Sequence, residues 1–282
     1  MPTRCPGGDG RHSPRPRAIA DDVASERKRM EATDLFVDPW GHGTPVVLVH
    51  GSLATGGDEW QAQRPLADEG FRLLVFDRRG YGRSPAADGE DFLRDADDVV
   101  ALMGDGAHLV GHSYGGLGAL VAAACRPEAT LSLALLEPAA FALGQHDPAG
   151  RALVNEVRAL WDQDLPDETW VVRFLTAVGS DPDALARELV AASVALTPLL
   201  RRGRPPWNGD LPLAALAAAG FPKLVVSGGH SPAFDAICDD LAGRIGASRA
   251  VAAGAGHEVQ FSGQPVNDLL RALWRGANAQ PC

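Results

Sequence analysis

The sequence has few cysteines, no long apolar run and no excess of positive charge, and each absence narrows what it can encode. Its four cysteines are spread over 282 residues without paired spacing, which indicates free thiols in a reducing compartment and gives no sign of a zinc site. No apolar run approaches the roughly 20 residues needed to span a bilayer. The N-terminal residues also lack the apolar core of a secretion signal. We therefore expect a cytoplasmic protein.

The net charge points to a small-molecule partner. The formal charge of -10 at pH 7 argues against a general binder of nucleic acid or of anionic membranes. A hydrophobic content of 45% is ordinary for a folded chain, and the length suits one large α/β domain or a core domain with an insertion. The sequence leaves the oligomeric state open.

The chain divides into three kinds of sequence. Residues 1–33 are rich in Pro, Gly and Arg without apolar periodicity, and they predict a disordered tail. Residues 34–138 and 213–282 alternate apolar strands with helices. In residues 139–212 this alternation gives way to helical stretches separated by prolines, which predicts a helical cap inserted over the core.

The alternation of strands and helices predicts the fold class. We expect an α/β fold, with a doubly wound, mainly parallel sheet and helices on both faces. In such sheets, sites form where loops leave the carboxyl ends of the strands, and four chemically interesting residues follow such ends. They are His50, Ser113, Glu137 and His257. The expected strands are 35–37, 45–50, 71–77, 107–110, 131–137, 223–227 and 248–252.

One stretch carries a motif for nucleophilic catalysis. Gly111 to Gly115 read Gly-x-Ser-x-Gly between an apolar strand and a helix of small residues. This pattern predicts a sharp strand-to-helix turn that holds the serine at strained backbone angles and exposes its hydroxyl. The hydroxyl would lie near a helix N-terminus, which favours developing negative charge. The sequence therefore predicts that Ser113 is a nucleophile.

Four ordered motifs together resemble those of the α/β-hydrolase family. They are Val49–Ser52, Asp77–Ser84, Gly111–Gly116 and Gly254–His257, and with their surroundings they cover about residues 35–276. The resemblance implies the serine-nucleophile branch, since haloalkane dehalogenases and epoxide hydrolases use aspartate at the turn. It says little about substrate, because the family includes esterases, lipases, thioesterases, lactonases and carbon–carbon hydrolases.

The resemblance implies a role for each of several residues. His257 would take the proton from Ser113 and return it to the leaving group. The backbone N–H groups of Tyr114 and Ser52 would form the oxyanion hole, with Leu53 replacing Ser52 if the loop is shifted. No metal and no organic cofactor is expected.

The acid of the triad is where this sequence departs from the family pattern. The family usually places it after the strand that here ends at Ser227, but Ser231 stands where an aspartate is expected. Asp235, four residues on, falls inside the next predicted helix. The alternative in the family is an acid after the preceding strand, where Glu137 lies. A buried carboxylate is costly without a partner, and His257 is a natural one. We favour Glu137 and keep Asp235 as the alternative acid.

Several other polar residues are expected to support the loops. His50 and His112 are predicted to hydrogen-bond neighbouring loops and not to act chemically. Asp77 is expected to hold the glycine-rich loop that follows it by accepting backbone N–H bonds. Arg78, Arg79 and Arg83 are expected to cover the surface and pair with nearby carboxylates, the alternative being that they attract an anionic substrate.

These observations favour a serine hydrolase that cleaves a small ester, thioester or lactone through an acyl-enzyme. Two other functions remain open. One is a carbon–carbon bond hydrolase, an acyltransferase or a cyclase that uses the same triad. The other is a non-catalytic small-molecule binding protein on the same scaffold, against which the intact Ser113 and His257 count.

Overall fold

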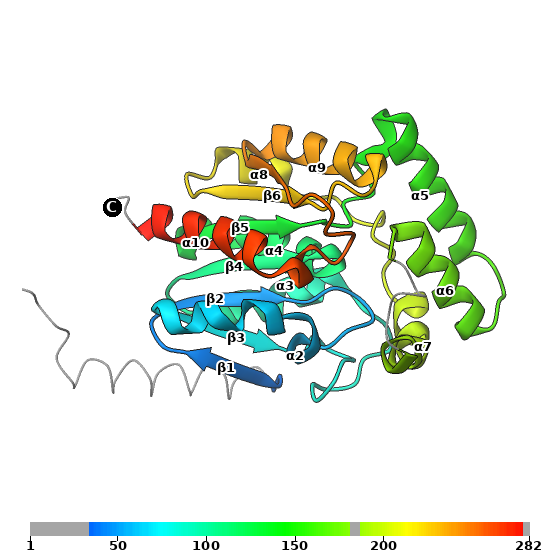
Figure 1. Ribbon diagram of the computed structural model, residues 1–282, viewed down its shortest axis with the longest axis horizontal. Helices are drawn as coiled ribbons and strands as arrows, with labels where there is room; N and C mark the ends of the chain where they lie inside the picture. Colours follow the sequence, from blue (N-terminus) through cyan, green and yellow to red (C-terminus); the bar gives the residue numbers. More distant parts are fainter. Residues whose placement is uncertain (1–33, 181–186, 279–282) are drawn as a thin grey trace, which may run out of the picture.

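The computed structural model describes residues 34–180 and 187–278, so the predicted tail 1–33 lies outside the described residues. A seven-stranded sheet forms its centre, with helices on both faces (Figure 1). The strands are β1 (Val37–Gly41), β2 (Thr44–Val49), β3 (Phe71–Phe76), β4 (Ala107–His112), β5 (Thr130–Leu136), β6 (Lys223–Ser227) and β7 (Ser248–Val251). Their order in the sheet is β1-β3-β2-β4-β5-β6-β7, and every pairing except that of β1 with β3 is parallel. The predicted fold class is confirmed.

The expected strand at 35–37 is wrong in position, because β1 runs from Val37 to Gly41 as the antiparallel edge of the sheet. Its pattern is hard to recognise because Asp38 and Pro39 are exposed and Trp40 alone is fully buried. Proline is tolerated at this position because an edge strand has one side without a hydrogen-bonded neighbour.

The described α-helices flank the sheet and cover one end of it. They are α2 (Gly56–Glu59), α3 (Phe92–Met103), α4 (Ser113–Cys125), α5 (Pro148–Trp161), α6 (Asp167–Val178), α7 (Arg187–Arg202), α8 (Leu213–Ala218), α9 (Pro232–Ile245) and α10 (Gln264–Asn278). Short 3-10 helices join them, at η1 (Gln61–Glu69), η2 (Pro127–Ala129), η3 (Gly144–His146) and η4 (Val259–Ser262). Among the helices that the structure describes, none combines the length and the apolar character needed to cross a bilayer.

The central strands are mostly apolar because both of their faces are buried. Along β2, Val47 and Val49 belong to the cluster that contains α3, α4 and α9, whereas Val46 and Leu48 belong to the cluster that contains η1 and α10. Successive side chains of a strand point to opposite faces, so a strand between two helical layers favours apolar residues at most positions. This is the physical basis of the continuous apolar runs in the sequence.

Helices α5, α6 and α7 gather beyond one end of the sheet (Figure 1). Leu53, in the loop after β2, is buried in one cluster with Leu160 of α5, Trp170 of α6 and Leu200 of α7. The helices therefore stand over loops that leave the carboxyl ends of the strands. The bounds of the cap as a domain, residues 139–212, stay a prediction.

Candidate active site

The turn from β4 into α4 holds Ser113 in an unusual backbone conformation. Its φ is +49°, a value that residues other than glycine rarely adopt. A Cβ on Gly115 would lie 2.2 Å from the carbonyl oxygen of His50, and one on Gly111 would lie 2.7 Å from the Cα of Gly116. Both glycines of the motif are therefore required by close backbone approach, and the strained turn expected from the sequence is present.

Three side chains far apart in the sequence meet beside this turn. His257 Nε2 lies 3.0 Å from Ser113 Oγ, and His257 Nδ1 lies 3.2 Å from Glu137 Oε2. Glu137 follows β5 directly, and its own φ is +44°. His257 lies in the loop after β7. A hydroxyl, an imidazole and a carboxylate thus form a continuous chain within hydrogen-bonding reach.

The Glu137 carboxylate is fully buried but well supplied with donors. Its Oε1 accepts the backbone N–H of Gly228 at 2.5 Å, and its Oε2 lies 3.1 Å from His230 Nε2. Burial raises the pKa of this carboxyl, but the hydrogen bonds from His230 and His257 outweigh that cost and lower the pKa to about 2. The carboxylate is therefore ionised at neutral pH.

His230 is a member of this group that sequence reasoning did not select. It lies in the loop after β6, one residue before Ser231, at the place where the family usually keeps its acid. Hydrogen bonding to Glu137 raises the pKa of His230. The available signal was a histidine in the usual acid loop together with a carboxylate at the end of the neighbouring strand.

The same three side chains offer donor atoms that converge. One atom each of Glu137, His230 and His257 lies within 4.8 Å of the other two. A small cation could bridge such a group, but Glu137 Oε2 already pairs with a nitrogen of each imidazole. We therefore interpret the cluster as a hydrogen-bonded set and assign no metal ligand.

Asp235, the alternative acid, is engaged elsewhere. It lies in the first turn of α9, where Ser227 Oγ donates a short hydrogen bond to its carboxylate. The Arg249 guanidinium lies 3.2 Å from the same oxygen. The carboxylate that the structure brings to His257 is that of Glu137.

The residues expected at the oxyanion hole border Ser113. Tyr114 follows it in the first turn of α4, and both Ser52 and Leu53 line the cavity beside it. The Ser52 hydroxyl donates to Glu90 at 2.9 Å, so this side chain helps to fix the loop. Leu53 has a φ of +68°, a third strained residue at the site.

A second histidine–glutamate pair joins the loops around the nucleophile. The Glu59 carboxylate accepts the backbone N–H of Gly51 at 2.9 Å and lies 3.1 Å from His112 Nδ1. His112 Nε2 lies 3.1 Å from the carbonyl oxygen of His257. Burial lowers the pKa of His112, but the Glu59 carboxylate outweighs this and raises it. His112 thus links the Gly51 loop to the His257 loop, in line with the supporting role expected for it.

Arg78 corrects an expectation, because it is buried and does not cover the surface. Its guanidinium lies 2.6 Å from Asp95 and 2.9 Å from Glu90, and it also donates to the carbonyl oxygen of Gly51. Two carboxylates and a carbonyl offset the cost of burying this charge. The backbone N–H of Arg78 donates to His50 Nε2, so His50 also supports this loop.

Asp77 and Arg79, the sequence neighbours of Arg78, make the contacts expected of them from the sequence. Asp77 accepts the backbone N–H groups of Gly56 at 3.0 Å and of Arg83 at 2.9 Å, and so holds the loops at the end of β3. Arg79 pairs with Asp98 at 2.8 Å and with the exposed Asp34 at 2.9 Å.

A cavity of about 130 Å³ opens beside Ser113 and His257. Helix α6 contributes Phe174 to its apolar lining. Three carboxylate residues, Asp58, Glu59 and Glu258, also border it. Further apolar lining residues come from α6 and α7, namely Leu175, Val178 and Leu196. The described part of the cap thus forms one wall of the cavity.

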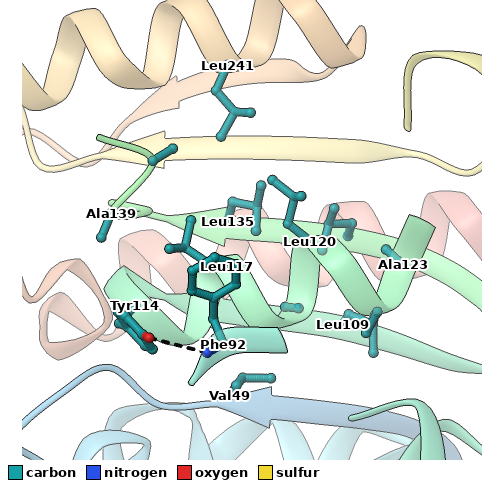
Figure 2. Packing of buried hydrophobic residues seen from close by; sticks show 14 of the residues in the cluster. Val49, Phe92, Leu109, Tyr114, Leu117, Leu120, Ala123, Leu135, Ala139 and Leu241 are labelled. Atoms are coloured by element: carbon teal, nitrogen blue, oxygen red, sulfur yellow. Dashed lines mark hydrogen bonds between the residues drawn. The ribbon is translucent and has the colours of Figure 1, made fainter. Parts of the chain in front are cut away.

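The buried hydrophobic layer under α4 holds the nucleophile's turn in place. Figure 2 shows Leu117, Leu120 and Ala123 of α4 against strands β4 and β5. The same view shows the Tyr114 hydroxyl, which accepts the backbone N–H of Phe92 at 3.3 Å. The start of α4 is therefore tied to α3 as well as to the sheet.

Comparison with known proteins agrees with the fold described above. The sequence model of the alpha/beta hydrolase family matches residues 46–269. The chain therefore belongs to the alpha/beta hydrolase family, as the four motifs indicated. Its placement in the serine-nucleophile branch agrees with the esterases and haloperoxidases among its relatives.

Two curated relatives match part of the chain. Over 92 residues it is 42% identical to the non-heme chloroperoxidase CPO-A1 of Kitasatospora aureofaciens, covering 30% of this chain and 33% of that protein. Over 93 residues it is 41% identical to the bifunctional esterase/perhydrolase DCH of Acinetobacter calcoaceticus, covering 30% and 34%. The chain thus matches about a third of the length of these relatives.

Solved structures match more of the chain. Est816, described as an N-acyl homoserine lactone degrading enzyme, superposes with a TM-score of 0.65 at 26% identity, covering 84% of this chain and 96% of that one. An alpha/beta hydrolase from Sphaerobacter thermophilus DSM 20745 gives a TM-score of 0.60 at 28% identity, covering 77% and 88%.

Proposed function

We propose that this protein is a serine hydrolase that cleaves a small ester, thioester or lactone through an acyl-enzyme. The observation that carries the proposal is the chain of contacts from Ser113 Oγ through His257 to Glu137, with distances of 3.0 and 3.2 Å. Hydroxyl, imidazole and ionised carboxylate in this order are the parts that acyl transfer requires.

The proposed mechanism follows from these contacts. His257 Nε2 takes the hydroxyl proton while Ser113 Oγ attacks the substrate carbonyl, and Glu137 stabilises the imidazolium that forms. The backbone N–H groups of Tyr114 and Ser52, or of Leu53 in place of Ser52, bind the oxyanion. The imidazolium then protonates the leaving group. Water attacks the acyl-enzyme by the same path in reverse and frees the serine.

The cavity limits the substrate. Its volume of about 130 Å³ is close to that of an engineered protein cavity of about 150 Å³ that holds benzene. We infer an acyl group with a short chain or a single ring. Neither Lys nor Arg is among the described residues that line the cavity, whereas Asp58 and Glu258 are. We therefore expect an acyl group that carries no negative charge.

Acyl transfer to an acceptor other than water is the second candidate. Its support is the name of one relative, the bifunctional esterase/perhydrolase of Acinetobacter calcoaceticus. The acyl-enzyme would be the same, and only the attacking molecule would differ. Carbon–carbon cleavage and cyclisation share the triad but have no comparable support here.

A fluorophosphonate probe tests the proposal directly. The wild-type protein should form a covalent adduct on Ser113, and the Ser113→Ala variant should form none. A series of p-nitrophenyl esters should then show the highest kcat/KM at two to four acyl carbons and a decline at eight or more. A folded protein that forms no adduct would contradict the proposal and favour the binding-protein alternative.

A further inference from the structure

One oxygen of the buried glutamate serves two imidazoles. Glu137 Oε2 lies 3.2 Å from His257 Nδ1 and 3.1 Å from His230 Nε2, and the other oxygen accepts the Gly228 N–H. The two imidazole centroids are 6.4 Å apart. A triad needs one imidazole on its carboxylate, so the second is an addition that the proposed reaction does not use.

His230 is the more accessible of the two. Its side chain is 15% exposed, compared with 6% for His257 and none for Glu137. Gly179, the C-cap of α6, packs on its ring, and a Cβ there would lie 2.4 Å from His230 Cε1. The His230 ring is therefore held between the cap and the core, and part of it is in contact with solvent.

The charges that face His230 favour a proton on it. Glu137 is the nearest carboxylate, and Glu258 and Asp235 also act on the ring. Asp235 is partly offset by Arg249, 3.2 Å away. A protonated His257, whose ring centroid lies 6.4 Å away, would oppose a positive charge on His230. Hydrogen bonding to Glu137 raises the pKa of His230 even though partial burial lowers it.

On the basis of the proposed function, we propose that His230 is a positioning residue. It fixes the Glu137 carboxylate and accepts the first proton as the pH falls, so that His257 remains an unprotonated base. The physical reason is that a proton on His230 neutralises the shared carboxylate. It also places a like charge near His257, which disfavours a second proton there.

The variant His230→Gln separates the two parts of this role. Glutamine can still donate a hydrogen bond toward Glu137 but cannot take up a proton. In this variant, His257 is the only imidazole beside the Glu137 carboxylate, so the carboxylate favours the protonated form of His257 alone. We expect the acid limb of the kcat/KM profile to move to higher pH by about one unit, a roughly tenfold loss of activity on that limb. His230→Ala should also lower kcat on the plateau, because it loses the donor.

The matched control is His42→Gln, which makes the same change at an exposed histidine between β1 and β2. Its pH profile should coincide with that of the wild type. An acid limb of His230→Gln that coincides with the wild type, or that moves to lower pH, would overturn the inference. Equal thermal unfolding temperatures of wild type and His230→Gln would show that the shift does not arise from unfolding.

A second readout does not depend on turnover. Imidazole NMR titrations in the Ser113→Ala background should show His230 taking its proton at higher pH than His257. Adding His230→Gln should raise the titration midpoint of His257. If the protein hydrolyses nothing but this midpoint moves, the proposed function fails and the inference on His230 holds. If the enzyme is active but the His257 midpoint does not move, the proposed function holds and the inference on His230 fails.

Discussion

Backbone strain is concentrated where the proposed chemistry takes place. The described residues other than glycine with positive φ are Asp34, Leu53, Ser113 and Glu137. The last three line or border the cavity or belong to the proposed triad. Each such residue costs on the order of 1–3 kcal/mol and persists only when its surroundings fix it. Leu53 is fixed by the cap cluster, and Glu137 by three hydrogen-bonding partners.

A pair of isosteric substitutions tests the choice of acid. Glu137→Gln should lower kcat by about 10²–10⁴-fold, because an amide neither stabilises the imidazolium nor enforces the required tautomer of His257. Asp235→Asn should change kcat by less than about threefold, since Asp235 is bonded to Ser227 and Arg249. Steady-state kinetics on a p-nitrophenyl ester measures both, and a large loss in Asp235→Asn with none in Glu137→Gln would reverse the assignment.

The low pKa of Glu137 also makes stability depend on pH. The folded pKa of about 2 lies below the ordinary value of 4.5, so its contribution is fully present above pH 4.5 and is lost as the pH falls toward 2. The two values correspond to about 3 kcal/mol. Urea unfolding between pH 2.5 and 6 should show a shallower acid decline in Glu137→Gln than in wild type. Glu156→Gln, an exposed site on α5, is the control, and equal slopes in all three proteins would contradict this.

At the scale of elements, the junction of β4 and α4 sets the geometry of the site. Helix α4 is buried on most of its surface, which explains its small residues and its lack of a polar face. Strands β2 and β5 pair with β4 on either side. The turn therefore projects Ser113 between the loop that carries Ser52 and the residue that follows β5, Glu137.

A glycine pair tests how tightly this junction is packed. Gly115→Ala would place a Cβ 2.2 Å from the His50 carbonyl oxygen, and backbone cannot move aside as a flexible side chain can. We expect a loss of at least about 2 kcal/mol in unfolding free energy. Gly243→Ala, inside α9 with no atom within 4 Å of the new Cβ, should instead stabilise by about 0.5–1 kcal/mol. Urea denaturation measures both, and equal effects would show that the junction has room.

At the scale of the molecule, the chain as a whole is negatively charged, and so are residues that line the cavity. The chain carries a formal charge of -10, and Asp58 and Glu258 border the cavity. Glu258 is anchored by a short hydrogen bond from Ser180. Since like charges repel and desolvation strengthens the effect, an anionic acyl group should be disfavoured on approach and in the cavity.

Two esters of equal acyl length test this expectation. The kcat/KM for p-nitrophenyl hemisuccinate should be roughly 3–10-fold below that for p-nitrophenyl butyrate at low salt. The gap should narrow as salt rises from about 10 to 500 mM, because the screening length shortens severalfold. Glu258→Gln should favour the anionic ester selectively, whereas Glu156→Gln should not. A ratio that is insensitive to both salt and Glu258 would refute the electrostatic account.

Local patterns in the sequence determined the fold class and the residues first proposed for catalysis. Apolar runs of strand length predict buried parallel strands because both faces of such strands are covered. The motif around Ser113 predicts its turn because Gly111 lies close to the backbone of Gly116 in the same motif, whereas Gly115 avoids a clash with the sequence-distant His50. His257 was found in the same way, from a short glycine-rich loop after the last predicted strand.

Only the tertiary structure decided that His257 contacts the carboxylate of Glu137 and not that of Asp235. It alone also showed that His230 contacts the same carboxylate. These contacts join residues about 90 to 120 positions apart, and they follow from the register that pairs Leu136 of β5 with Val226 of β6. That register brings the loop after β6 beside Glu137. The burial of Arg78 also depends on the tertiary structure, because the residues around the start of α3 bring Glu90 and Asp95 to its guanidinium. The sequence favoured Glu137 from its place after a predicted strand but left Asp235 open, because the contacts themselves depend on how the strands and loops align in space.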